Sequence, residues 1–273
     1  MKFVKNMLVS MLLLSSLICI HPSSSKANAN TVFLNIDGYY LLYSAPSTPY
    51  LDENNRMMVP LRSFSSLFGA TVTYNAVSQT ATVMEGNNSL KLTANSKTIE
   101  VNGQKQELDT TPVLKNNGFF LPFKSVVDAF HIKSSILDMG YGSGTTIVVS
   151  DARFLEQSPL KEINDQRSVD EEQYINYGLF PKSFAMNMKD NSINISMISR
   201  NILGVNLDFK NIKSGIWVVS ENDTQQAVSK DTADYKIKKG DMIVNNYSAN
   251  YEHISDVKYI FVFPRIRDTQ QKI

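Results

Sequence analysis

Side chains that usually bind metals or act as nucleophiles are scarce in this chain. The sequence has three histidines and one cysteine, and both His21 and Cys19 lie in an N-terminal segment that we expect to be removed. Removal would leave His131 and His253 as the imidazoles and would leave no thiol. We therefore expect neither a disulfide framework nor a cysteine nucleophile, and a metal site with three imidazole ligands is excluded.

The remaining candidates for hydrolytic chemistry are one serine and two groups of acids. Ser143 lies in the Gly-Tyr-Gly-Ser-Gly stretch at 140–144, but it is not centred between glycines two positions away, as a nucleophile elbow requires. Asp170-Glu171-Glu172, or Asp231 with Asp234, could supply the paired carboxylates of a glycoside hydrolase. Both groups of acids lie in polar, turn-like contexts, and neither forms an Asp-x-Asp-x-Asp-Gly calcium loop. We expect solvated surface at both and assign no catalytic residue, cofactor or metal.

Four tyrosines near the start of the chain are candidates for ligand contact. Tyr39, Tyr40, Tyr43 and Tyr50 lie close together in the sequence, and exposed tyrosine rings can stack on sugar rings. Alternate tyrosines are also typical of a half-buried strand, where they pack within the sheet. Both interpretations stay open on the sequence alone.

Two cations, Arg62 and Lys124, stand at equivalent places in two similar stretches of the chain. Each directly follows an apolar-Pro-apolar triplet where a helix is expected to begin. A positive charge there opposes the helix dipole, so an isolated one is disfavoured. We expect each cation to have a local carboxylate partner or to lay its stem along the surface, rather than to form a ligand site.

The first 29 residues have the pattern of a secretory signal peptide. Lys2 and Lys5 precede an apolar run at 7–20, and Ala-Asn-Ala at 27–29 is a small-x-small cleavage site. The apolar run is shorter than the roughly 20 residues that span a bilayer, and no later segment approaches that length. The sequence therefore predicts a secreted, extracellular protein without a transmembrane span after processing.

The charge of the processed chain argues against nucleic acid as a partner. Loss of Lys2, Lys5 and Lys26 from the 27 Lys and Arg residues would leave 24 basic residues against 26 acidic ones, a formal charge of −2. Binding to nucleic acid depends on a stripe of Lys and Arg that neutralises phosphates, and none is evident.

The stretches at 54–69 and 116–131 follow one pattern and constitute an internal repeat. Each has an Asn-Asn turn, then the apolar-Pro-apolar triplet and cation, then apolar residues spaced for one face of a short helix. The proline suits the first helical turn, and Gly69 suits the end of the first helix, whereas His131 in its place adopts positive φ less readily. The repeated motif comprises Val59, Pro60, Leu61, Arg62, Phe64, Phe68 and Gly69 in the first copy and Leu121, Pro122, Phe123, Lys124, Val126 and Phe130 in the second.

Strands are predicted around the two helices and beyond them. Asp37-Gly38 and Asn102-Gly103 are hairpin turns that follow alternating strands at 32–36 and 98–101. Further strands are expected at 71–74, 80–83 and 145–149. In the C-terminal part, alternation at 184–188 and 193–197 predicts a hairpin, and strands are expected at 204–209, 215–220, 235–238, 242–245 and 257–263.

The paired Val59-Pro60-Leu61-Arg62 and Leu121-Pro122-Phe123-Lys124 motifs, with their Asn-rich turns, resemble the copper amine oxidase N-terminal-like domain, also called a stalk domain. The resemblance covers residues 31 to 150. It implies a sheet wrapped on a helix, used as a non-catalytic module in exported proteins of Gram-positive bacteria, and it does not imply copper. Lys124 and His131 depart from the usual Arg and Gly of the family's motif, so the second copy is expected to pack less regularly.

Asn250-Tyr251-Glu252-His253 resembles the segment that houses the tyrosine-derived cofactor in true amine oxidases. The threonine expected three residues before the asparagine is Tyr247, and without three histidine ligands Tyr251 could not be oxidised in place. We expect an ordinary surface turn here.

Together these patterns predict an α+β protein with duplicated antiparallel sheet-plus-short-helix units at 31–85 and 97–150. The domains are expected to be a signal peptide at 1–29, a stalk-type domain at 30–150, a polar linker with at most one short helix at 151–178, and a small, mainly antiparallel β domain at 179–273. The function expected is a secreted, non-catalytic module that binds cell-wall polymer, matrix or another surface protein. Two alternatives stay open: an exported hydrolase or enzyme accessory with active groups in 179–273, and homodimerisation through an open sheet edge.

Overall fold

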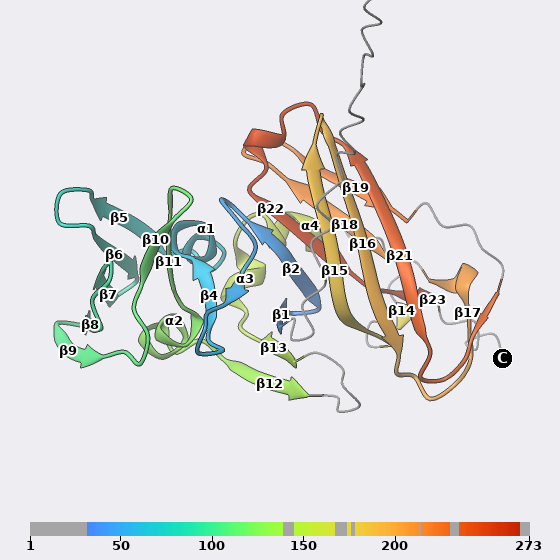
Figure 1. Cartoon of the computed structure of the whole chain (residues 1–273), viewed down its shortest axis with the longest axis horizontal. Helices are drawn as coiled ribbons and strands as arrows, with labels where there is room; N and C mark the ends of the chain where they lie inside the picture. Colours follow the sequence, from blue (N-terminus) through green and yellow to red (C-terminus); the bar gives the residue numbers. More distant parts are fainter. Residues whose placement is uncertain are drawn as a thin grey trace, which may run out of the picture.

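A computed structural model of the chain describes residues 32–138, 145–166, 174–175, 178–212, 214–229 and 235–267 (Figure 1). Strands predominate over helices and form several mostly antiparallel sheets, an arrangement that fits the predicted α+β class in broad terms. The signal peptide, Ser143, the acids at 170–172, Asp231 and Asp234 fall outside the described residues. Among the helices that are described, none is long and apolar enough to cross a membrane.

The two copies of the motif lie on neighbouring central strands of a four-stranded sheet. Its order is β10 (Val113–Lys115), β11 (Gly118–Pro122), β4 (Met57–Pro60) and β3 (Tyr50–Leu51). β4 and β11 run antiparallel with Val59 opposite Leu121, which are equivalent residues of the two copies. Each strand leads directly into a helix, α1 (Leu61–Ser66) or α2 (Phe123–Phe130). The motif therefore pairs with its own copy about a local two-fold axis.

Both helices begin one residue later than the sequence predicted. Pro60 and Pro122 have extended backbone, at φ −65°, ψ 121° and φ −60°, ψ 126°, and flank the first helical turn instead of lying in it. Both helices are followed by left-handed backbone, at φ 81° for Gly69 and φ 52° for His131. His131 thus adopts the conformation that the sequence indicated it would adopt less readily, because the end of α2 requires that turn.

An aromatic cluster forms the core beneath these helices. Phe64 of α1 lies with its ring centroid 5.5 Å from Phe123 of α2, and Phe68 lies 5.4 Å from Phe130. Phe154, fully buried, contacts both Phe64 and Phe68 at centroid distances of 5.8 and 5.5 Å. The periodic apolar face predicted for each helix is therefore the face that packs.

Phe154 belongs to a segment that was predicted to be a polar linker, and this prediction is wrong for its described part. Two short helices, α3 (Arg153–Glu156) and α4 (Leu160–Asp165), occupy it. Phe154, Leu160 and Ile163 are fully buried in the same core as the repeat helices. Three apolar anchors among many polar residues were enough to dock the segment, although its average composition is that of a linker.

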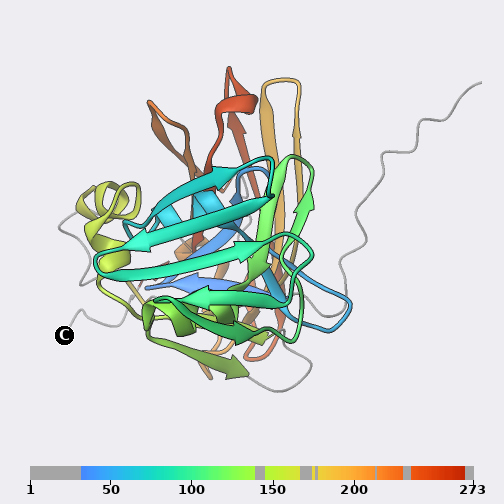
Figure 2. The ribbon, with the colours of Figure 1, turned by 90° about the vertical axis from the view of Figure 1, so that its left-hand side faces the viewer.

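A five-stranded antiparallel meander lies on one side of the helices, and its strands appear one above the other in Figure 2. Its bounds are β5 (Thr71–Asn75), β6 (Thr80–Glu85), β7 (Asn88–Thr93), β8 (Thr98–Val101) and β9 (Gln104–Glu107). The predicted Asn102-Gly103 turn joins β8 to β9, with φ of 50° and 80°. One face of this sheet closes the helix core through Ala81, Val83, Leu90 and Leu92.

The N- and C-terminal parts share a seven-stranded sheet, visible where β2 and β22 cross the centre of Figure 1. In order it contains β12 (Ser134–Asp138), β13 (Thr145–Val149), β1 (Val32–Ile36), β2 (Tyr39–Ser44), β22 (Tyr259–Phe263), β18 (Gly215–Val219) and β19 (Thr224–Val228). β1 and β13 pair in parallel, and β2 pairs with β22 across the predicted boundary between domains. The sheet thus continues where the sequence predicted two separate units, because β22 completes the hydrogen bonding of β2.

A three-stranded sheet packs on the other face of the shared sheet. It comprises β15 (Leu179–Lys189), β16 (Ser192–Asn201) and β21 (Met242–Asn250), and a second core lies between the two sheets. The hairpin predicted around residues 189–192 is present with longer strands, whereas the strands expected at 204–209 and 235–238 shrink to the short pair β17 (Leu207–Asp208) and β20 (Lys236–Ile237). Single 3-10 turns at Phe209–Asn211 and Ile254–Asp256 and the pair β14 (Tyr174–Ile175) with β23 (Ile266–Arg267) complete the described elements.

Candidate functional site

A groove runs between β5 and the β10–β11 hairpin, beside the start of α1. We call it the Tyr74 groove, and its lining is mainly apolar. Within it, Tyr74 is 38% exposed and Leu114 is 41% exposed. The groove is lined by Ala45, Pro46, Pro60, Leu61, Arg62, Val72, Tyr74, Leu114, Asn117, Gly118 and Phe119.

The aromatic wall of the groove is a pair of rings from two different sheets. Tyr74 of β5 and Phe119 of β11 meet edge to face, with ring centroids 6.0 Å apart and planes at 68°. This arrangement is a favoured one for two aromatic rings and holds the Tyr74 ring in place while part of it faces solvent. A ring that is both exposed and positioned is suited to contact a ligand.

Local backbone chemistry explains why these residues meet. Asn116 and Asn117 both adopt left-handed backbone, at φ 49° and 59°, which is the geometry of a tight hairpin turn. At Gly118 a side chain is excluded, since a Cβ atom would lie 2.6 Å from Pro46 Cγ. The turn and this close approach set Phe119 against β5.

A cation without a partner stands at the edge of the groove. Arg62 is exposed, and among the described residues it makes no ion pair or hydrogen bond. Its repeat counterpart Lys124 pairs with Asp128 one turn later in α2, with Nζ and Oδ2 2.6 Å apart. Of the two arrangements expected for these cations, Lys124 has the local carboxylate partner, whereas Arg62 has none among the described residues and is left free to interact with an anionic group.

A second hollow adjoins the groove and shares Tyr74 with it. Its other lining residues are Thr73, Asn75, Ser78, Thr80, Thr82 and Lys91, from the first three strands of the meander. Opposing hydroxyls lie in register, as with Thr73 opposite Thr82. The surface on this side of Tyr74 is therefore rich in hydrogen-bonding groups, in contrast to the apolar groove.

The tyrosines that the sequence singled out are not an exposed cluster. Tyr39 is fully buried and stacks on Phe263, with centroids 4.8 Å apart. Tyr40 is 8% exposed, on the other face of the sheet, and burial raises the pKa of its phenol to about 12. Tyr43 and Tyr50 are half-buried. The packing interpretation is therefore correct for Tyr39 and Tyr40. Instead, the groove is lined by Tyr74, which no pattern in the sequence distinguished.

Of the segment that resembles an amine oxidase cofactor site, Tyr251 belongs to the core. Tyr251, expected in a surface turn, is 6% exposed and packs between the seven-stranded and three-stranded sheets, while Glu252 and His253 beside it are exposed. Nowhere in the described part of the chain do three His, Cys, Asp or Glu side chains gather as they would around a metal ion.

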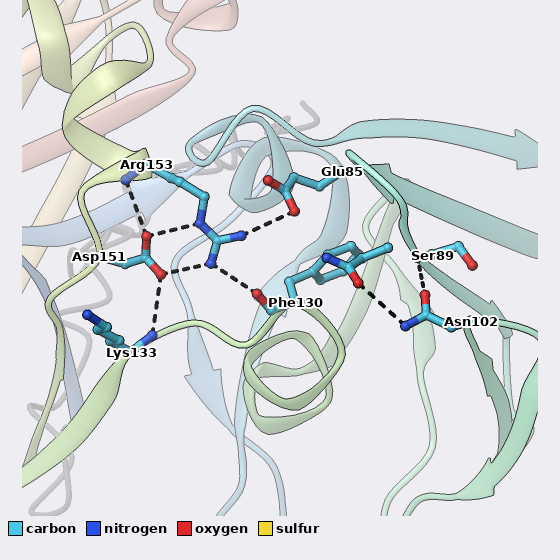
Figure 3. A network of polar contacts seen from close by, with 8 residues as sticks. Glu85, Ser89, Asn102, Phe130, Lys133, Asp151 and Arg153 are labelled. Atoms are coloured by element: carbon cyan, nitrogen blue, oxygen red, sulfur yellow. Dashed lines mark hydrogen bonds and ion pairs between the residues drawn. The ribbon is translucent and has the colours of Figure 1, made fainter.

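The densest polar cluster is built around Arg153 at the start of α3 (Figure 3). Arg153 donates from Nε to Asp151 Oδ1 at 3.0 Å and from Nη2 to Asp151 Oδ2 at 2.8 Å. It also donates to the backbone oxygen of Phe130 at 3.0 Å and contacts Glu85 Oε2 at 3.2 Å. The guanidinium thus connects the end of α2, the end of β6 and the loop after β13.

In this cluster the pKa values of two nearby carboxyls are shifted in opposite directions. Hydrogen bonds from Arg153 lower the pKa of Asp151, whereas burial and the charge of Asp151 raise the pKa of Asp37. Asp37 Oδ2 is buried and accepts no hydrogen bond from the residues that the structure describes. Opposed pKa shifts are typical of acid–base pairs, but structural ion pairs cause them too, and here the carboxylate of Asp151 is occupied in holding three elements together.

A polar hollow between α4 and the β18–β19 turn brings three acids together: Glu162, Glu221 and Asp223. Each of them has a partner. Ser158 Oγ donates to Glu162 Oε1 at 2.6 Å, Lys258 Nζ lies 2.7 Å from Glu221 Oε1, and Gln225 Nε2 donates to Asp223 Oδ2 at 2.7 Å. Local contacts therefore account for the position of each acid.

The comparisons with known proteins agree with the repeat motif. No curated protein sequence is significantly similar to the chain. The family described as Copper amine oxidase N-terminal domain matches at residues 35–136, a range that contains both copies of the motif, the meander and every residue that lines the Tyr74 groove. The family match at residues 35–136 thus agrees with the resemblance that the repeated motif indicated.

Proposed function

We propose that the processed chain is an exported, non-catalytic protein of the cell surface that binds a partner through the Tyr74 groove. Export is supported by the pattern of the first 29 residues. The partner classes that we propose are cell-wall polymer, extracellular matrix or another surface protein.

The single observation that carries this proposal is the chemistry of the groove. It places a held but partly exposed ring, Tyr74, and an exposed Leu114 next to a cation, Arg62, that has no described partner. A partly exposed ring and an apolar side chain next to an unpaired cation offer a partner both hydrophobic contact and a charge to bind. The acids in the polar hollow and the Arg153 cluster, by contrast, are engaged with neighbours in the protein itself.

We further propose that the two motif copies derive from duplication of one sheet-plus-helix unit. The antiparallel pairing of Val59 with Leu121 supports this origin, as does the entry of each strand into a helix. Within such a pair, the groove is a place where the copies have diverged, since Arg62 lies free at its edge and Lys124 is paired with Asp128.

Sedimentation of the processed chain with purified bacterial cell walls tests the proposal. Tyr74→Ala and Arg62→Gln should each reduce the bound fraction, because they remove the ring and the cation of the groove. Two matched controls exist: Tyr235→Ala removes another exposed tyrosine, and Lys124→Gln removes the equivalent cation of the second copy. Binding that is equally strong in all four variants would show that the groove is not the binding site.

The polar hollow is the observation that favours the alternative of an exported hydrolase or enzyme accessory. Hydrolysis of cell-wall material by the processed chain, abolished by Glu221→Gln or Asp223→Asn and unaffected by Tyr74→Ala, would support that alternative and contradict the binding proposal.

A further inference from the structure

β5 is an edge strand with one open side. It pairs with β6 along its whole length, from Thr71 opposite Met84 to Asn75 opposite Thr80. On its other side no described strand is paired with it, and its residues make no other backbone hydrogen bond within the described part of the chain. The outward N–H and C=O groups of β5 are therefore available to an added strand.

Two other edge strands, β15 and β9, carry features that oppose such pairing. β15 contains Pro181 and an irregularity of register between Pro181 and Ser183. β9 is fully exposed and carries Lys105 and Glu107. β5 reads Thr-Val-Thr-Tyr-Asn, without a charge or a proline, and is rich in residues that favour strands. It is thus an unprotected edge of the kind that soluble proteins usually cover.

The open side of β5 borders the Tyr74 groove. Val72 and Tyr74 alternate along the strand and both line the groove, with Leu114, Phe119 and Pro46 among the residues that complete it. Side chains two positions apart in a strand lie roughly 7 Å from each other on one face. An extended peptide laid along β5 would therefore place every second side chain over this apolar surface.

Arg62 favours a ligand that carries a negatively charged group. It stands at the start of α1 and lines the same groove without a partner in the described residues. A carboxylate, the anionic group that an unmodified peptide side chain supplies, can bind a free guanidinium through paired hydrogen bonds.

Taking the groove as the binding site, as proposed above, we infer that its ligand is an extended peptide segment of a partner protein, which joins the meander as an additional strand on β5. The segment carries apolar side chains at alternate positions and an acidic residue that meets Arg62. Backbone hydrogen bonds to β5 supply affinity, and the groove selects the side chains.

A phage-displayed library of random nonapeptides, panned on the processed chain and counter-selected on Tyr74→Glu, supplies the probe. Enriched peptides should share alternate apolar residues with an acid, and Arg62→Gln should weaken their binding, whereas Lys124→Gln and Tyr235→Ala should not. The thermal unfolding of each variant is measured to confirm that it is folded.

Backbone methylation separates strand addition from simple side-chain docking. The best peptide is synthesised with a single N-methyl group at each position in turn. Methylation at one set of alternate positions should weaken binding by about tenfold or more, as expected for a lost hydrogen bond in a contact that excludes water. Methylation at the intervening positions should change affinity by about twofold or less, because those amides point away from β5.

The outcomes distinguish this inference from the function it rests on. Failure to enrich any groove-dependent peptide, or binding that shows no alternation on methylation, overturns strand addition. If cell-wall binding is nevertheless lost in Tyr74→Ala, the proposed function stands with a different ligand. A dimer seen by light scattering and dissociated by Tyr74→Glu would identify a second copy of the chain as the occupant and would also overturn the inference.

Discussion

Replacement of Arg153 by methionine tests whether its polar cluster is a structural clasp. The substitution keeps an unbranched side chain of similar length but removes the hydrogen bonds to Asp151 and Phe130 and the ion pair with Glu85. We expect the variant to fold with a lower free energy of unfolding, because Asp151 would keep only its backbone donors and the last carbonyl of α2 would lose the guanidinium that donates to it.

The expected loss in unfolding free energy follows from how far the charged groups are shielded from water. The exposed fraction is 27% for the Arg153 side chain, 22% for Glu85 and 11% for Asp151. Breaking a fully buried pair costs about 3–5 kcal/mol, whereas exposed pairs contribute about 0–1 kcal/mol. For this partly shielded cluster we expect a loss of about 2–3 kcal/mol, measured by urea unfolding of the processed chain at pH 7.

Lys124→Met is the matched control, since it breaks an ion pair whose cation is 80% exposed. We expect this change to cost less than about 0.5 kcal/mol. Equal effects of Arg153→Met and Lys124→Met would refute the assignment of Arg153 as a clasp.

The pH dependence of the difference in unfolding free energy between wild type and Arg153→Met gives a second check that Arg153 is a clasp. Arg153 lowers the pKa of Asp151 below the ordinary value of 3.8. A carboxyl with a lowered folded pKa contributes stability that is present above its unfolded pKa and is lost as pH falls through the folded value. The difference in unfolding free energy between wild type and Arg153→Met should therefore be constant near neutral pH and should shrink as the pH falls below about 4.

Three further substitutions have defined outcomes in the same assay. Asp37→Asn should raise the free energy of unfolding at pH 7 by less than about 1 kcal/mol, because it removes a partly solvated charge held beside Asp151 with a buried, unpartnered Oδ2 atom. Because the folded pKa of Asp37 is raised, the stabilisation from this group is present below pH 3.8 and is lost as pH rises through the folded pKa. The gain in unfolding free energy from Asp37→Asn should therefore vanish in acid. A gain that persists at pH 3 would contradict the charge of Asp37 as its cause. Phe154→Ala should cost about 3–5 kcal/mol, since the ring is fully buried against Phe64 and Phe68, and a cost under 1 kcal/mol would show that α3 is not docked as described. His131→Gly should stabilise by about 0.5–1 kcal/mol by relieving left-handed backbone at φ 52°, and a destabilised variant would show that the imidazole itself contributes.

Local patterns in the sequence predicted much of the N-terminal architecture. The helix faces that contain Phe64 and Phe130, the turn at Asn102-Gly103 and the paired motif all depend on neighbours within a few residues, and the structure contains them. The segment with α3 was predicted wrongly because burial of Phe154 depends on a partner surface far away in the chain, which average composition does not reveal.

The candidate site was less accessible to prediction. Tyr74 follows Thr73 in an ordinary alternating strand, and nothing in its neighbours indicates that its ring meets Phe119 at the rim of a groove. Tyr39 and Tyr40 are adjacent in the sequence and were therefore candidates for ligand contact, yet pairing of β2 with β1 and β22 buries both. Exposure of an aromatic side chain is decided by which strands adjoin it, and strand order is not a local property.

The sequence by itself determined the tight turns and the apolar faces of the two short helices after Pro60 and Pro122, because proline, glycine, asparagine and the spacing of apolar residues act on backbone conformation within a turn or two. Only the tertiary structure decided that β22 continues the sheet begun by β1 and β2, and that β5 keeps an open edge beside the Tyr74 groove. Each of these depends on contacts between segments distant in the chain, where packing in three dimensions selects one arrangement among several that the local pattern allows.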